Sequence, residues 1–142
     1  MSRILLISIK PQFAERIFSG SKTIELRKTS PKVNEGDLIL FYVTSPEKMI
    51  KGIGRVKGLI EDTPANLWSA YRDTAGIGKE LYFDYYNNSN KAIGILLKDV
   101  VEFQKSVSLS DIRSSIPSFA PPQSYRYLSK FDFLRKFSQF SA

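Results

Sequence analysis

Short apolar runs, separated by few helical segments, are the feature that most constrains how this chain can fold. Five segments have the apolar or alternating pattern of strands: residues 4–9, 22–27, 37–43, 49–60 and 91–101. Five stretches have apolar residues at helical spacing or are short enough for one or two turns: residues 11–19, 64–72, 78–87, 109–115 and 125–137. Three of the strands follow one another without a crossover helix, which disfavours a doubly wound parallel sheet. We therefore predict an α+β fold, a small mixed β-barrel with peripheral helices.

Proline and glycine mark several boundaries of these elements. Pro11 suits the first turn of a helix that Gly20 ends in a left-handed conformation. Pro64 follows Thr63, a good N-cap residue. Three glycines punctuate the strand 49–60, where they are typical of bulges, barrel corners or close backbone approach. The proline-rich stretch 117–124 is a loop.

Two residue types are missing, and their absence removes whole classes of chemistry. The 142-residue chain has no Cys and no His, so Cys-based zinc sites, thiol catalysis and the Ser-His-Asp triad are excluded. Any chemistry must rest on Lys, Arg, Asp, Glu, Tyr, Ser or Thr, and we predict neither a metal nor a cofactor. The apolar run before Lys10 is too short for a signal peptide or a spanning helix, so we expect a cytoplasmic protein without membrane contact.

The charge distribution is uneven. The net charge is +7, with 11 basic against 5 acidic residues over positions 1–60 and an acidic excess over 61–102. A polarised basic surface of this kind favours a polyanion such as nucleic acid as partner, although a solvated basic face without a partner has the same composition.

The densest polar cluster is the segment Gly20–Arg27, with the sequence GSKTIELR. If Ile24 and Leu26 face the core, Glu25 and Arg27 share the other side of the strand. One interpretation is an ion pair on a solvated sheet face, which contributes little. The other is chemical: a desolvated Lys22 can act as a base, and Glu25 can shuttle protons.

Three further segments carry candidate contacts. Tyr125 and Arg126, after Gln123 and Ser124, interleave an aromatic ring with a cation, as in proteins that stack unpaired bases. The alternative is that these aromatics begin a helix and belong to the core. The turn 44–48 has hydroxyls and a cation that can line the mouth of a site, or it is a plain turn. The aromatic run 82–86 packs a helix onto the barrel, or binds a base or a protein partner.

The ordered set of these landmarks resembles the ASCH domain family, a branch of the PUA-like barrels related to the EVE and YTH domains. The residues that carry the resemblance are Ser8-Ile9-Lys10-Pro11, Ile17 to Arg27, Gly36-Asp37, Tyr42 to Pro46, the glycine-bearing strand, Pro64 to Trp68, and Pro122 to Leu128. The most specific piece is G-x-K-T-I-E-L-R, and the resemblance covers about residues 4–128. It implies a single domain over 1–142, with a core at about 4–128 and a C-terminal helix at about 125–138.

The resemblance also implies a cleft that holds RNA or another nucleic acid. Position by position, it places Lys22, Glu25 and Arg27 at the cleft and Lys10 and Ser45 near its rim. It further implies that Gln123, Ser124 and Arg126 face the cleft from the C-terminal side.

Some small members of the family are similar to amidohydrolases of acylated cytidine and use a Lys and a Thr of this segment. Here Lys22 matches the Lys, but Glu25 stands where the Thr belongs, so that activity is not carried over. Other members are described as ribonucleases.

Two functions follow, and the sequence leaves open whether the chain is an enzyme. The first is an RNA-binding module that holds RNA or a modified base in a basic cleft, with Lys22 and Arg27 exposed and Tyr125 stacking. The alternative is a hydrolase acting on a modified nucleoside or on RNA, with Lys22 and Glu25 as the proton-transfer pair. A third possibility is an adaptor for an unknown protein partner.

Overall fold

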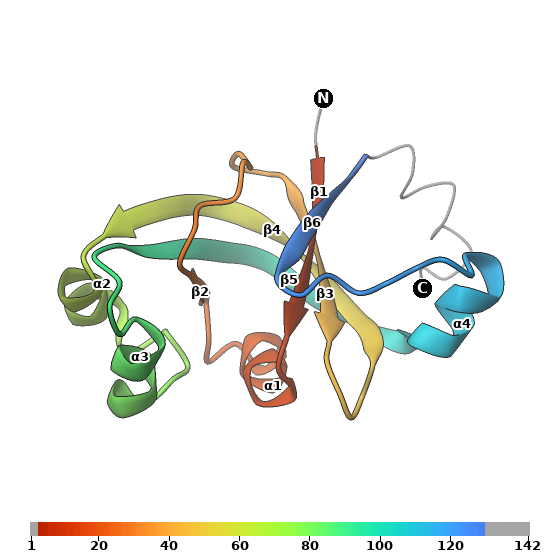
Figure 1. Ribbon diagram of the computed structural model, residues 1–142, viewed down its shortest axis with the longest axis horizontal. Coiled ribbons are helices and arrows are strands. Elements are labelled where there is room, and N and C mark those ends of the chain that lie inside the picture. Colours follow the sequence, from red (N-terminus) through yellow and green to blue (C-terminus); the bar gives the residue numbers. More distant parts are fainter. Residues whose placement is uncertain (1–2, 130–142) are drawn as a thin grey trace.

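The computed structural model describes residues 3–129, and this part of the chain forms one six-stranded sheet with four helices (Figure 1). In chain order the elements are β1 (Arg3–Ile9), α1 (Pro11–Ser19), β2 (Ile24–Arg27), β3 (Leu38–Val43), β4 (Met49–Asp62), α2 (Pro64–Tyr71), α3 (Lys79–Tyr85), β5 (Ala92–Ser108), α4 (Leu109–Ser115) and β6 (Tyr125–Ser129). Every strand and helix expected before residue 116 is present, with end shifts and a longer β5. The predicted α+β class is confirmed.

The strand order is β2-β5-β4-β3-β1-β6. β1 pairs with β3 in parallel, and every other neighbouring pair is antiparallel. Among the described strands, β2 and β6 form the two edges and do not pair with each other, so the sheet is open, which corrects the predicted barrel. Just before β2 the chain bonds to other elements: Lys22 N–H donates to Arg16 O and Thr23 N–H donates to Thr74 O.

The glycines of β4 allow it to bend and pack closely, as their pattern predicts. The register between β4 and β5 shifts at three places, including the steps from Ile50 to Gly52 and from Val56 to Gly58. A Cβ atom on Gly52 would lie 2.6 Å from the carbonyl oxygen of Val101, too close for any larger residue.

The helix α1 begins and ends where the sequence predicts. Pro11 occupies its first turn, and Gly20 ends it at φ +90° with its N–H bonded to Ile17 O. Ala14 and Ile17 are buried against one face of the sheet. Because the chain turns at Gly20 and enters β2 soon after, α1 and the polar segment around Glu25 are held next to each other.

The predicted C-terminal helix is wrong over residues 125–129, which form the edge strand β6. This strand pairs antiparallel with β1, placing Tyr127 opposite Leu5. Tyr125 and Tyr127 pack on one side of the sheet and Leu128 on the other. The free edge of β1 and this alternation outweigh the helical spacing of the apolar residues. The remainder of the expected helix, 130–138, lies outside the described residues.

Three apolar clusters hold the fold together. The first lies between the sheet and α1, and the second lies on the opposite face under α4. The third packs α2 and α3 against β2 and the first half of β5, and Figure 1 shows these two helices at the end of the sheet opposite α4. No helix of residues 3–129 is long and apolar enough to cross a membrane.

Candidate functional site

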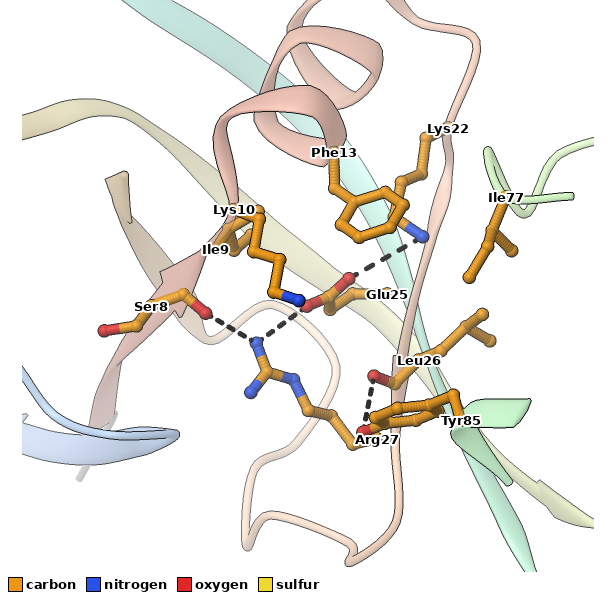
Figure 2. Close-up of a pocket in the computed structure, with 10 residues that line it drawn as sticks. All are labelled: Ser8, Ile9, Lys10, Phe13, Lys22, Glu25, Leu26, Arg27, Ile77 and Tyr85. Carbon is orange, nitrogen blue, oxygen red and sulfur yellow. Dashed lines mark hydrogen bonds and ion pairs between the residues drawn. The ribbon is translucent and has the colours of Figure 1, made fainter. Parts of the chain in front are cut away.

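A pocket of about 170 Å³ opens where the end of β1, the start of α1, β2 and α3 meet (Figure 2). It is lined by Ser8, Ile9, Lys10, Phe13, Lys22, Glu25, Leu26, Arg27, Ile77 and Tyr85. Pockets that enclose a drug-sized ligand span about 300–1,000 Å³, so this one suits a smaller group.

The Glu25 carboxylate lies between two cations in this pocket. Arg27 Nη2 is 2.7 Å from Glu25 Oε2, and Lys22 Nζ is 3.7 Å from Glu25 Oε1. The three side chains are 10%, 12% and 2% exposed, respectively, so the solvated surface ion pair considered for this segment is wrong. The expected exposure of Lys22 and Arg27 is corrected as well. The segment before α3 covers Lys22, while Arg27 is enclosed by its contacts with Ser8, Ser124 and Glu25.

The Lys22 ammonium is held in a nearly dry position. Its Nζ donates a 2.6 Å hydrogen bond to Ala75 O in addition to facing Glu25. Burial lowers the pKa of Lys22, and Arg27 and Arg16 lower it further, while Glu25 partly opposes these effects. A lysine in this position gives up its proton more readily than a solvated one.

The segment 74–77 fixes the stem of Lys22. Arg16 Nη1 donates a 2.7 Å bond to Gly76 O, and Thr23 N–H bonds to Thr74 O. Gly76 has φ +64°, and a Cβ atom there would lie 2.6 Å from the Cβ of Lys22. The close approach and the left-handed backbone both require glycine at this position.

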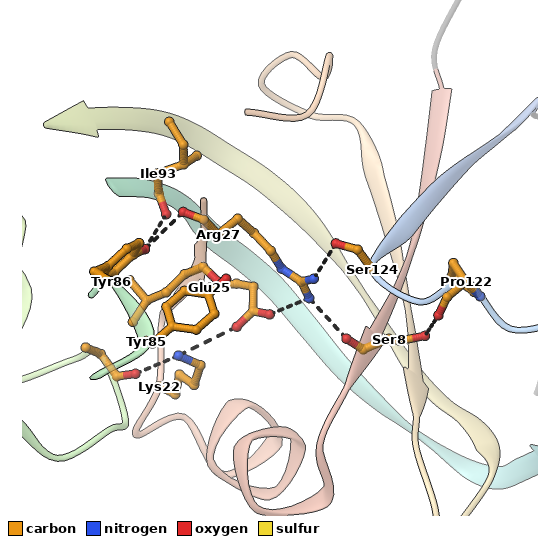
Figure 3. Close-up of polar contacts among 11 residues, drawn as sticks. Ser8, Lys22, Glu25, Arg27, Tyr85, Tyr86, Ile93, Pro122 and Ser124 are labelled. Atoms are coloured by element: carbon orange, nitrogen blue, oxygen red, sulfur yellow. Dashed lines mark hydrogen bonds and ion pairs between the residues drawn. The ribbon is translucent and has the colours of Figure 1, made fainter. Parts of the chain in front are cut away.

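The Arg27 side chain spans the open side of the sheet, from β2 to β1 and the start of β6 (Figure 3). Its guanidinium donates to Ser8 O at 3.1 Å and to Ser124 Oγ at 3.0 Å, besides the Glu25 carboxylate. Ser8 Oγ in turn donates to Pro122 O. Arg27 Nε is buried and has no acceptor among the described residues. A side chain thus connects the edge strand β2 to β1 and to Ser124, the residue before the other edge strand, β6.

Apolar side chains complete the pocket, and the pattern of the sequence did not single them out. Phe13 and Tyr85 appear in Figure 2 on either side of the Glu25 carboxylate, and Ile77 lies beside them. Tyr82 and Tyr86 are buried, as predicted for a helix packed on the sheet, which leaves Tyr85 to reach the pocket. Burial raises the pKa of Tyr85. The i, i+4 spacing of Tyr82 and Tyr86 places these two rings on the same face of α3, so Tyr85 lies on a different face. This spacing is the sequence pattern from which Tyr85 could have been identified.

Of the other candidate residues, the structure places two at this site. Lys10 is exposed and lines the pocket, and Ser124 is joined to it through Arg27. Ser45 is exposed in the turn after β3 and does not line the pocket, and neither does the exposed Gln123.

The two aromatic-cation candidates of β6 lie elsewhere. Tyr125 packs on the core beneath α1, with its ring 5.9 Å from that of Tyr127. The Arg126 guanidinium lies 6.0 Å from the ring centre of Phe119, which belongs to the opposite cluster under α4. Arg126 therefore does not face the cleft, because adjacent residues of a strand point to opposite sides.

The site can donate hydrogen bonds from its cations and accept them at the Glu25 carboxylate. Within residues 3–129, no group of three or more Asp and Glu side chains lies close enough to hold a metal ion.

Comparison with known proteins places the chain among relatives of the same fold. Residues 5–115 match the family described as a domain of unknown function, DUF365. A protein of Zymomonas mobilis named "ASCH domain-containing ribonuclease" is 32% identical over 125 residues, covering 88% of this chain and 84% of its own. A crystal structure of ASCH from Zymomonas mobilis superposes with a TM-score of 0.90 at 29% identity, over 98% of this chain and 96% of that one.

A more distant similarity concerns the fold alone. The human THYN1 protein, in complex with DNA containing 5-methylcytosine, superposes with a TM-score of 0.63 at 10% identity. The superposition covers 97% of each chain.

Proposed function

Because this chain belongs to the ASCH domain family, we propose that it binds single-stranded RNA and holds one unpaired nucleotide in the pocket around Glu25. The observation that carries the proposal is the pocket itself, in which three cations and one carboxylate stand beside aromatic walls. The name of the Zymomonas relative supports RNA as the partner.

The charge of the site favours a polyanion. Lys10, Lys22 and Arg27 outnumber Glu25 in the pocket, and the exposed Lys28 adds a cation 4.9 Å from the Tyr85 ring. The whole chain carries +7. Phosphates that follow the bound nucleotide meet Lys10 and Lys28 at the rim, and binding releases their counterions.

The apolar walls favour a single strand over a duplex. Phe13, Ile77 and Tyr85 offer contact area to a flat ring, and a base reaches them only when it is unpaired. Stacking on an aromatic side chain contributes about 1–3 kcal/mol per base.

The experiment is fluorescence anisotropy with a short labelled single-stranded RNA, at about 50 and about 200 mM salt. Two phosphate contacts, at Lys10 and Lys28, give a slope of log affinity against log salt of about −1.4, since each contributes about −0.7. Lys22→Ala combined with Arg27→Ala should abolish binding at the higher salt. Lys105→Ala, which removes an exposed cation from β5, is the matched control.

Circular dichroism shows whether each variant is folded. Binding by the folded double variant as tight as that of wild type would rule out this pocket as the RNA site.

A second function, cleavage of the bound RNA, is favoured by the desolvated Lys22 beside Glu25 and by the name of the Zymomonas relative. In this reaction the Glu25 carboxylate takes the proton of a ribose 2′-hydroxyl, whose oxygen bonds to the adjacent phosphorus. The bond from phosphorus to the 5′-oxygen breaks, and that oxygen receives a proton from the Lys22 ammonium. A proton then passes from Glu25 to Lys22, which restores the pair and leaves a 2′,3′-cyclic phosphate.

The cleavage reaction has its own test. End-labelled RNA should yield fragments ending in a cyclic phosphate, and a 2′-deoxy substitution at the cleaved position should prevent the cut. Glu25→Gln should abolish the cut while the protein stays folded. Turnover by folded Glu25→Gln at the wild-type rate would remove this mechanism.

A further inference from the structure

The polar groups of the pocket form an ordered row, with a donor on each side of an acceptor. The Lys22 ammonium and the Arg27 guanidinium flank the Glu25 carboxylate, as Figures 2 and 3 show. All three side chains are at most 12% exposed, so water competes weakly for their hydrogen bonds. A ligand is therefore selected by the pattern of its own donors and acceptors.

Each member of the row has hydrogen-bonding capacity left. Lys22 has three N–H groups, of which one is bonded to Ala75 O. Arg27 has five: Nη2 donates both of its hydrogens, to Ser8 O and Glu25, and Nη1 donates one to Ser124. The second Nη1 hydrogen and the buried Nε–H remain for a ligand. A carboxylate accepts at about four lone-pair positions, and the hydrogen bond from Arg27 to Glu25 uses one.

We infer that this row recognises the imide edge of an unpaired uracil, an inference that rests on the RNA-binding function proposed above. Uracil presents an acceptor, a donor and an acceptor along its pairing edge, the complement of Lys22, Glu25 and Arg27. Its N3–H donates to the Glu25 carboxylate, while its two carbonyl oxygens accept from Lys22 Nζ and from the remaining Nη1 hydrogen of Arg27. The bound base stacks against the aromatic walls, and its phosphates run toward the rim.

The other three bases would place an acceptor against the Glu25 carboxylate or a donor against one of the two cations. Cytosine and adenine carry an acceptor nitrogen where uracil carries N3–H, so a lone pair would face the Glu25 carboxylate. Guanine offers N1–H to Glu25 but sets its 2-amino group against one of the cations. A pocket built for a given hydrogen-bond pattern rejects ligands that leave its buried polar groups unpaired.

A phosphate fits the row less well than a base edge. It has acceptors only, so it would leave the Glu25 carboxylate facing another negative charge. The volume of about 170 Å³ and the walls of Phe13, Ile77 and Tyr85 also suit a flat single ring. This inference excludes the cleavage mechanism described above, because the same groups cannot hold a base edge and act on the backbone.

The test compares U9 and C9 RNA oligomers, which have equal length and charge, by anisotropy with the wild-type protein. We expect U9 to bind about tenfold more tightly, the discrimination of one good bidentate contact. Free uridine should displace labelled U9, while 3-methyluridine, which lacks the N3–H, should be at least about tenfold weaker. Glu25→Gln should reduce the difference in affinity between U9 and C9, because the glutamine amide can donate a hydrogen bond to cytosine as well as accept one from uracil.

The outcomes separate the two proposals. Equal affinity for U9 and C9, or equal displacement by uridine and 3-methyluridine, overturns base recognition while RNA binding stands. Failure of both oligomers to bind refutes RNA binding and this inference together. The comparison of the two free nucleosides uses the wild-type protein, so it does not depend on whether Glu25→Gln folds.

Discussion

Replacing Gly76 by alanine should displace Lys22 and weaken RNA binding at the site. The accompanying loss of stability can be worked out from the structure. Gly76 has φ +64°, where a non-glycine residue is strained by about 1–2 kcal/mol. A new Cβ atom would lie 2.6 Å from Lys22 Cβ, and overpacking of this kind costs about 1–3 kcal/mol. Alanine restricts the unfolded chain and returns about 0.4–1 kcal/mol. The free energy of unfolding should therefore fall by about 1–4.6 kcal/mol.

Two other glycines separate the contributions. Gly36 also has a positive φ, of +91°, but nothing lies within 4 Å of the position of a Cβ atom, so Gly36→Ala reports backbone strain alone and should cost about 1 kcal/mol. Gly58 has neither strain nor a close contact, and Gly58→Ala should be neutral or slightly stabilising.

The assay is urea unfolding followed by the fluorescence of Trp68, the single tryptophan, together with RNA affinity under folding conditions. Only Gly76→Ala should lose affinity for RNA. Equal destabilisation by Gly76→Ala and Gly36→Ala, or unchanged RNA binding by Gly76→Ala, would refute the argument that Gly76 positions Lys22.

Three further predictions concern the charged residues of the pocket. The first concerns pH: folding lowers the pKa of Lys22 below its unfolded value of 10.5, so the neutral amine favours the folded state. This contribution to stability is complete above pH 10.5 and is lost as the pH falls through the pKa of the folded state. The free energy of unfolding of wild type, relative to that of Lys22→Met, should therefore rise between pH 7 and about 10. A lysine cannot reproduce the fork that joins Ser8, Ser124 and Glu25, so Arg27→Lys should lower the free energy of unfolding by about 1–3 kcal/mol, and an unchanged urea midpoint would contradict this. Lys10→Ala should leave the melting temperature unchanged and make the salt slope of RNA binding shallower by about 0.7; the same slope as wild type would show that Lys10 contacts no phosphate.

Local patterns in the sequence were sufficient to predict most of the elements. The start of α1 at Pro11 and its end at Gly20, the Thr63 cap of α2, and the bends of β4 each depend on a few neighbouring residues. The C-terminal segment was mispredicted because its spacing is compatible with a helix, and pairing with β1, which is distant in the sequence, decides in favour of a strand.

The composition of the site was also partly visible in the sequence. The parity of β2 predicts that Glu25 and Arg27 share a side, and they form a 2.7 Å ion pair. Burial could not be predicted, because Lys22 is covered by α1 and by residues 74–77, which lie more than fifty positions away. Tyr85 reaches the pocket for the same reason, because α3 is far from β2 in the chain, whereas Phe13 lies on α1, the element just before β2.

By itself, the sequence determined the set of possible chemistries: without Cys and His, only Lys, Arg, Asp, Glu and hydroxyl groups remain. It also determined that Lys22, Glu25 and Arg27 would be near one another, because they fall within six residues of one segment. The tertiary structure decided that this cluster is buried rather than solvated. It also decided that Arg27 spans the open side of the sheet and that Arg126 lies on the opposite face. These outcomes depend on long-range packing, and packing sets the local dielectric, which distinguishes this buried cluster from a common surface ion pair.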